Sequence, residues 1–275
     1  MRLDSHQHFW NYDEQQYPWI PKGSPLHRDW LPDDLAPLLA GANLDGCIAV
    51  QARQTLEETR WLLMLADQAP IIKGVVGWVD LRSGNVGEDL AQLTTNSKLV
   101  GVRHVVQDEP DESFMLQPEF GRGIGQLQPF GLAYDLLIYP KQLPAAIALV
   151  KRFPEQRFVL DHLAKPCIKE RVLSPWREQI CELAQSPRVH CKLSGMVTEA
   201  NHTTWKFEDF VPYLDAAFEA FGEDRVMFGS DWPVCLLAAS YPRAFDILDR
   251  YLGNAPSARE KVLGMNAAKF YGAFA

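Results

Sequence analysis

Apolar residues gather in eight short runs that are spaced along the whole chain. Each run is rich in Val, Ile and Leu. Such runs are typical of strands that are buried on both faces of a parallel sheet. The expected strands cover residues 1–6, 45–51, 71–81, 99–107, 131–139, 157–163, 188–195 and 225–231.

Stretches with helical spacing lie between most of these runs. In residues 56–66, for example, one helical face carries Leu56, Thr59, Leu63 and Ala66. Eight alternations of strand and helix in about 250 residues predict an α/β fold, the (β/α)8 TIM barrel. A doubly wound sheet is the rival, but no G-x-G-x-x-G follows the first strand. We expect helices over 55–69, 86–96, 140–153, 174–186, 207–222, 241–252 and 256–272.

No linker or change of composition divides the chain, so we expect one barrel domain over residues 1–275. Residues 9–33 are rich in aromatic residues and Pro, and they show no periodicity. We expect this segment to be a long loop after the first strand that walls an active site.

The composition narrows the choice of partners. The formal net charge is −8, and the 27 basic residues form no long run. Nucleic acid and anionic membranes are therefore excluded as main partners.

The chain starts without an apolar signal core and contains no run of 18 apolar residues. Five scattered cysteines without a C-x-x-C pair predict reduced thiols and a cytoplasmic location.

Polar residues stand where the first and last expected strands end, and barrel enzymes carry their catalytic residues at strand ends. Side chains alternate along a strand, so His6 and His8 point to the same side. Together they can bind one cation or orient one substrate. Asp231 ends the eighth strand before Trp-Pro. It either caps the next loop or serves as a metal ligand or a general base with a raised pKa.

Other strand ends carry further candidates. His162 ends the sixth strand, where a histidine is either structural or catalytic. Three strand ends carry a cation, namely Arg103 at the fourth strand, Lys165 after the sixth and Lys192 at the seventh. Each cation either pairs with Asp135 or Asp161, or supplies positive charge for a carbonyl, carboxylate or oxyanion. No P-loop or nucleophile elbow is recognisable, which disfavours catalysis by a side-chain nucleophile.

Three segments resemble the amidohydrolase superfamily: LDSHQHFW (3–10), VLDHLAKP (159–166) and MFGSDWPV (227–234). The segments VQARQTLEETRWLL, GVRHVVQDEPDE and VHCKLSGM are similar to its sugar-lactone hydrolase branch. That branch is typified by L-fuconolactone and L-rhamnonolactone hydrolases, and the resemblance covers nearly the whole chain. It implies a (β/α)8 barrel with a metal site at His6, His8 and Asp231, and with His162 as the histidine of strand six.

The chain departs from the binuclear members of this superfamily. Those members carry a bridging carboxylated Lys or a Glu at strand four and a His at strand five. Here strand four ends with Arg103 and His104, and strand five offers Asp135 but no His. We therefore expect at most one divalent ion, zinc or manganese, and catalysis without a metal is the alternative.

The resemblance and the strand-end residues together predict hydrolysis of a sugar-acid lactone to the aldonic acid. The substrate is expected to be of the L-fucono- or L-rhamnono-lactone type. Asp231 would activate the attacking water as general base, and Arg103, Lys192 or His162 would stabilise the oxyanion. The residues expected to bind the substrate are Gln51, Arg53, Trp10, Trp78, His104 and Trp232.

Two other functions are compatible with the pattern. One is a metal-dependent, non-oxidative decarboxylase of an aromatic carboxylic acid on the same barrel. The other is a catalytically inactive barrel that binds a sugar, which the intact polar set disfavours. Loops 9–33, 107–120 and 164–175 are expected to set specificity. The partner is expected to be a small molecule, and the oligomeric state stays open, a homodimer included.

Overall fold

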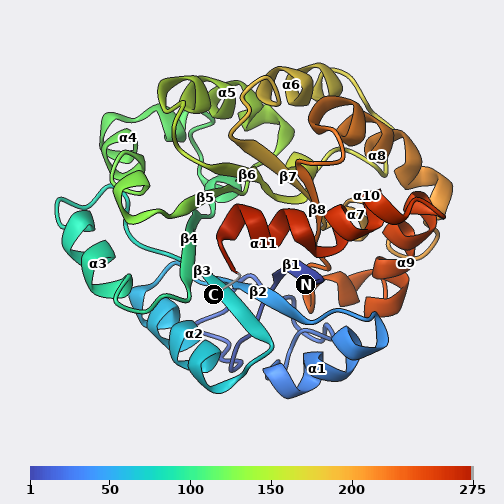
Figure 1. Cartoon of the computed structure of the whole chain (residues 1–275), viewed down its shortest axis with the longest axis horizontal. Helices are drawn as coiled ribbons and strands as arrows, with labels where there is room; N and C mark the ends of the chain where they lie inside the picture. The colour runs from blue at the N-terminus through green and yellow to red at the C-terminus, as the bar shows by residue number, and fades with distance from the viewer. Residues whose placement is uncertain (274–275) are drawn as a thin grey trace.

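The structure is a computed structural model that describes residues 1–273, and it contains eight parallel strands paired in the order β1 to β8. Figure 1 shows the strands as a ring with most of the helices outside it. The predicted (β/α)8 barrel is confirmed. The strands are β1 (Leu3–Gln7), β2 (Gly46–Val50), β3 (Ile72–Gly77), β4 (Leu99–His104), β5 (Ala133–Leu136), β6 (Phe158–Leu160), β7 (Val189–Leu193) and β8 (Val226–Phe228).

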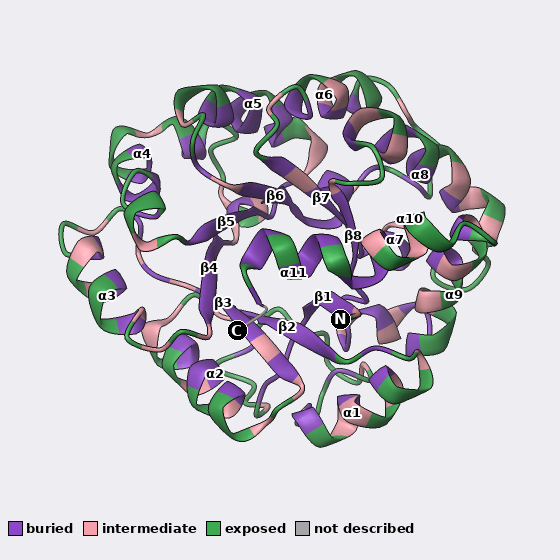
Figure 2. Cartoon of the chain, in the orientation of Figure 1, coloured by how far each residue is buried: buried purple, intermediate pink, exposed green. Residues whose placement is uncertain are grey.

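Helices follow the strands, and most of them lie where the pattern predicts. The main helices are α1 (Pro32–Gly41), α2 (Leu56–Gln68), α3 (Val86–Leu93), α4 (Pro118–Ile124), α5 (Leu143–Arg152), α6 (Trp176–Leu183), α7 (Met196–Glu199), α8 (Phe207–Phe221) and α9 (Tyr241–Leu252). The pattern misses α1, α4 and α7, because these helices are short or contain proline or glycine, which weakens a helical signal. Figure 2 shows buried residues on the strands and on the inward faces of the helices.

The predicted helix over 256–272 is wrong in one respect, because the structure divides it. Helix α10 (Pro256–Glu260) and helix α11 (Asn266–Tyr271) are joined by a π-helical turn at Lys261–Met265. Gly264 in this turn lies against β1: a β-carbon there would sit 2.4 Å from the Arg2 Cα. A regular helix with side chains could not approach the strand so closely.

Helix α11 closes the end of the barrel where the strands begin, and Figure 1 shows it across the middle of the ring. Asn266 Nδ2 donates to the carbonyl of Val226, the first residue of β8. Residues of α11 share a buried cluster with Leu3 and Ile48 from the barrel interior. Since this end is filled, only the opposite end, where the strands finish, is available for a site.

Residues 9–31 form a long loop after β1, two residues shorter than predicted because Pro32 and Asp33 begin α1. The loop is anchored by a bridge between Trp10 and Trp30. All five cysteines are free thiols, as their spacing predicts. Among residues 1–273, none of the helices has the length and apolar character required to cross a membrane.

Candidate active site

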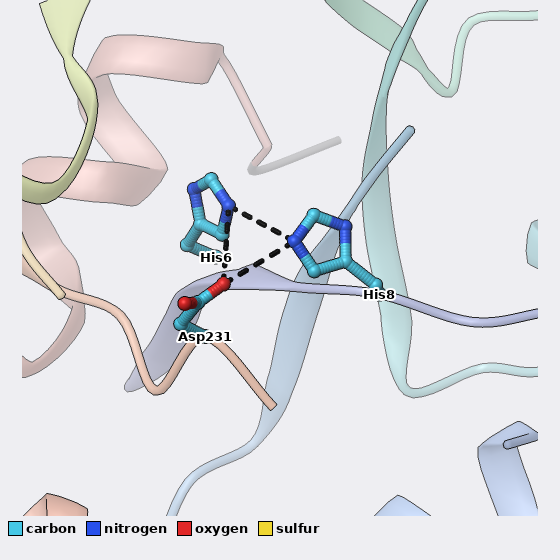
Figure 3. A group of neighbouring side chains, drawn as sticks. All are labelled: His6, His8 and Asp231. Carbon is cyan, nitrogen blue, oxygen red and sulfur yellow. Dashed lines mark hydrogen bonds and ion pairs between the residues drawn. The ribbon is translucent and has the colours of Figure 1, made fainter. Parts of the chain in front are cut away.

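The barrel closes between β1 and β8 at the point where both strands end. Asp231 N–H donates to the His6 carbonyl at 2.8 Å, and His8 N–H donates to the Trp232 carbonyl at 2.7 Å. Gly229 permits this approach, because a β-carbon there would sit 2.7 Å from the His6 Cβ. Asp231 itself has a left-handed φ of 56°. Closure therefore brings His6, His8 and Asp231 together, as Figure 3 shows.

The three side chains present their ligating atoms as a compact triangle. His8 Nε2 lies 3.3 Å from both His6 Nε2 and Asp231 Oδ1, and the third edge, from His6 Nε2 to Asp231 Oδ1, is 3.8 Å. A tetrahedral zinc ion with bonds of about 2.0–2.1 Å needs edges of about 3.3–3.4 Å. His8 Nδ1 lies 2.8 Å from the Val50 carbonyl and must donate to it, which leaves Nε2 free as a ligand. The donor set thus fits a divalent ion.

The environment of Asp231 holds it ionised. Burial by itself raises the pKa of this carboxyl, but the imidazoles of His162, His8 and His6 outweigh burial, so the pKa lies well below its ordinary value. The expectation of a raised pKa is therefore wrong. At neutral pH the side chain is a carboxylate that can bind a cation or accept a proton.

His162 is the third imidazole that faces Asp231. Its Nε2 lies 3.9 Å from Asp231 Oδ1, and its Nδ1 lies 2.8 Å from the Ser194 hydroxyl. Burial lowers the pKa of His162 to about 4. The ring is therefore neutral at physiological pH, and when Ser194 donates to Nδ1, its Nε2–H is a donor toward the cavity.

The backbone that carries His162 is a single turn of left-handed helix made without glycine. Residues 162–165 have φ values of 53°, 54°, 59° and 51°. Such a turn costs about 1–2 kcal/mol per residue. Two hydrogen bonds hold it: Lys165 N–H donates to the His162 carbonyl at 2.7 Å, and Trp176 Nε1–H donates to the Leu163 carbonyl at 2.6 Å. Strain of this kind gathers at functional sites.

Arg103 lies beside the triangle with its guanidinium in several contacts. One nitrogen donates to Asp161 at 3.1 Å and lies 3.2 Å from His6 Nε2, and the other donates to the Gln51 carbonyl at 2.5 Å. An ion at the triangle would have to displace the contact between Arg103 and His6. The ion pair of Arg103 with Asp161 is one of the two alternatives predicted for this cation.

Lys192 lies in a sealed network next to His6. Its Nζ lies 2.5 Å from Asp135, 3.1 Å from Asp161 and 3.1 Å from His6 Nδ1, and the side chain has no exposed area. Burial raises the pKa of Asp135 to about 6 although Lys192 opposes it. Burial also acts to raise the pKa of Asp161, but Lys192 and His6 hold it well below its ordinary value. Tyr271 from α11 completes the network by donating to Asp135.

A cavity of about 780 Å³ opens above these residues. Its lining includes six predicted site residues, namely His8, Gln51, Arg53, Arg103, His162 and Asp231. The sequence therefore predicted six of the residues that line this cavity.

The sequence profile of the Amidohydrolase family matches residues 3–273. The chain belongs to the amidohydrolase family. It is 44% identical to an L-fucono-1,5-lactonase of Burkholderia multivorans over 98% of this chain and 96% of the relative. It is 38% identical to the L-fucono-1,5-lactonase of Burkholderia ambifaria, over 98% and 95% of the two chains. A crystal structure of a Burkholderia multivorans amidohydrolase with bound zinc superimposes with a TM-score of 0.94 at 43% identity, over 99% of each chain. The predicted family and its lactone-hydrolysing branch are confirmed.

Six of the predicted site residues of this amidohydrolase lie outside the cavity lining, namely His6, Trp10, Trp78, His104, Lys192 and Trp232. His6 belongs to the triangle with His8 and Asp231. Three of the other five have structural contacts that explain their positions. Trp10 is fully buried and donates to the Arg28 carbonyl, Trp78 donates to His104, and Trp232 packs edge-on against Trp30. His104 is held by Glu109 at 2.7 Å. We therefore leave these residues out of the substrate contacts proposed below, and we assign Lys192 to the sealed network.

The sequence reasoning missed several residues that line the cavity of this amidohydrolase, among them Trp19, Tyr139 and Glu199. Trp19 belongs to the 9–33 loop, which was expected to wall the site, but no spacing distinguishes it from the other aromatic residues there. Glu199 ends the short helix α7. Only the expectation that loops after the strands carry the site could have pointed to these three residues.

Proposed function

We propose that this amidohydrolase hydrolyses a sugar-acid lactone to the free aldonic acid, with a substrate of the L-fucono- or L-rhamnono-lactone type. The observation that carries the proposal is the buried, ionised Asp231 among three imidazoles in the cavity. The substrate class is supported by the 44% identical relative, which is an L-fucono-1,5-lactonase.

In the proposed reaction, water attacks the lactone carbonyl carbon and gives its proton to Asp231. The new C–O bond converts the carbonyl into a tetrahedral oxyanion. When the intermediate collapses, the bond from the carbonyl carbon to the ring oxygen breaks, and Asp231 returns the proton to the departing oxygen. The ring opens to an aldonic acid with one new hydroxyl group, so that atoms and charges balance.

His162 and Arg103 would act on the oxyanion in this scheme. The neutral His162 can donate from Nε2, and Arg103 adds a fixed positive charge. Both line the cavity. Because both are held by hydrogen bonds before substrate arrives, little reorganisation is needed during the reaction.

A divalent ion, zinc or manganese, would be held by His6, His8 and Asp231. When bound, such an ion polarises the carbonyl or lowers the pKa of water toward about 7. The triangle of donor atoms and the fixed tautomer of His8 support this assignment.

The test is acid release from a panel of six-carbon aldonolactones, including L-fucono-1,5-lactone, measured with a pH indicator with and without chelator. We expect turnover well above the spontaneous rate. Turnover lost with the chelator and restored by zinc or manganese supports the metal site, and turnover that survives supports metal-free catalysis. Release of carbon dioxide from a benzoate-type acid, with no lactone hydrolysed, would favour the decarboxylase alternative instead.

A further inference from the structure

We propose that Lys165, Glu199 and Tyr139 form a subsite that recognises hydroxyl groups of the substrate. The three side chains line the same cavity as Asp231. This inference rests on the proposed lactone hydrolysis, and it assigns the residues that recognise the hydroxyl groups of the sugar lactone. We call these three residues the hydroxyl subsite.

The left-handed turn at residues 162–165 places the subsite next to the reacting centre. Lys165 lies three residues after His162, and its N–H donates to the His162 carbonyl, so the two residues belong to one turn. The left-handed turn carries both side chains to the cavity lining. Lys165 is thus tied to His162, which faces Asp231.

Lys165 and Glu199 face each other without a close hydrogen bond. Lys165 Nζ lies 4.0 Å from Glu199 Oε1. Within residues 1–273, neither the ammonium nor the carboxylate takes part in a hydrogen bond. Their side chains are 17% and 22% exposed, so solvent screens them only in part. At this distance one hydroxyl group can accept from the ammonium and donate to the carboxylate.

The charges of the subsite select a neutral polar group. Lys165 and Glu199 carry opposite charges, so an anionic substituent would be attracted by the ammonium and repelled by the carboxylate. A hydroxyl group can accept a hydrogen bond from the ammonium and donate one to the carboxylate. The Lys165 ammonium also lies 5.3 Å from the centre of the Tyr139 ring, which keeps it over the cavity wall.

The subsite differs from the other cations of the cavity region. Arg103 and Lys192 already have ion pairs at 3.1 Å and 2.5 Å, and Arg53 in the cavity lining donates to Gln16. A site that hydrogen-bonds a substrate hydroxyl rejects the analogue that lacks it, because its polar groups are then left unpaired. Lys165 and Glu199 are therefore suited to discriminate between substrates.

The test compares two lactones with the same six-membered ring, L-fucono-1,5-lactone and the unsubstituted δ-valerolactone. We expect Lys165→Met and Glu199→Gln each to lower kcat/KM for the hydroxylated lactone about 10- to 100-fold. For δ-valerolactone we expect a change of less than about twofold, since no hydroxyl contact is lost. The matched controls are Lys169→Met and Glu170→Gln, which make the same changes at exposed positions outside the cavity lining.

Each outcome bears on the inference. A selective loss on the hydroxylated lactone in either variant, with the control variants unchanged, supports it. Equal loss on both lactones, or no loss on either, overturns it while the proposed function stands. A wild-type protein that hydrolyses neither lactone overturns the proposed function and this inference together. Thermal unfolding of each variant shows whether a general loss comes from misfolding, and Glu199→Gln then decides the question if Lys165→Met is unstable.

Discussion

Two charged regions lie close together in this amidohydrolase and are built in opposite ways. In the sealed network, Lys192 is surrounded by Asp135, Asp161 and His6, with no exposed side-chain area. In the hydroxyl subsite, Lys165 and Glu199 are partly exposed and stand 4.0 Å apart.

The difference separates structural charges from charges that are available to a ligand. A buried charge must be paired, because an unpaired one costs several kcal/mol. Paired charges hold their neighbours in place, and here that neighbour is His6. A partly exposed charge without a close partner stays in contact with solvent, and in the proposed subsite it gains its hydrogen bonds when a substrate binds. Substitutions in the sealed network and in the hydroxyl subsite should therefore have different consequences.

The largest effect is expected at Asp231, which belongs to neither region and faces the reacting centre. Asp231→Asn removes the proton acceptor while keeping the shape, so we expect kcat to fall by about 10³-fold. The matched control is Asp108→Asn, an exposed carboxylate that lines the same cavity. Steady-state lactone hydrolysis measures both variants, and a variant at position 231 that keeps more than a tenth of the wild-type kcat would contradict the assignment.

The next largest effect concerns the sealed network. Lys192→Met removes the ammonium from Asp135 and Asp161, so we expect the free energy of unfolding to fall by about 3–5 kcal/mol. The exposed control Lys169→Met is expected to change it by less than about 0.5 kcal/mol. Urea unfolding followed by circular dichroism measures both. If the two variants were equally stable, Lys192 would not have the structural role assigned here.

His190 offers a third test, because it is a half-buried titratable group that has no ion pair with any carboxylate of residues 1–273. Burial, with Arg225 and Lys269 nearby, lowers its pKa to about 4 from the ordinary 6.5. As the pH falls from about 6.5 to about 4, the unfolded chain takes up this proton before the folded protein does, so stability is lost. We expect His190→Gln to remove on the order of 2 kcal/mol of that loss.

The measurement for His190 is urea unfolding of wild type and variant at pH 8 and pH 4.5. Taking the difference between the two proteins removes the contributions of the other titrating groups. An identical pH dependence in both proteins would show that this histidine is not held neutral by the fold.

The smallest effect is expected at the edge of the cavity. Trp19 is 42% exposed, lines the cavity and donates from Nε1 to the Ala52 carbonyl. Trp19→Ala removes an aromatic face worth about 0.5–1.5 kcal/mol, so KM for the lactone should rise about 2- to 10-fold. Trp19→Phe keeps a ring and should stay close to wild type, and an unchanged KM in both variants would remove Trp19 from the substrate site.

The local pattern of apolar and polar residues predicted the barrel and the meeting of His6, His8 and Asp231, but it did not predict which loop residues line the cavity. The apolar runs and the His-x-His spacing are short-range signals, and barrel closure then fixes where His6, His8 and Asp231 meet. Which aromatic residue reaches the cavity is decided by the path of a long loop. Trp10 therefore packs inside the 9–33 loop while Trp19 faces the substrate space. The raised pKa expected for Asp231 failed because that expectation weighed burial alone, whereas the imidazoles of His162, His8 and His6 outweigh burial.

The most direct test of the account is single-turnover hydrolysis of L-fucono-1,5-lactone by excess enzyme in water enriched in oxygen-18, with the products analysed by mass spectrometry. Water activated by Asp231 places one oxygen-18 atom in the carboxylate of the aldonic acid during the first turnover. An acid without the label in that first turnover, with oxygen-18 found in the Asp231 carboxylate instead, would show that Asp231 attacks the lactone carbonyl carbon and that water then opens the resulting anhydride at the enzyme's carboxyl carbon. Such a result would contradict the role of Asp231 as the base that activates water.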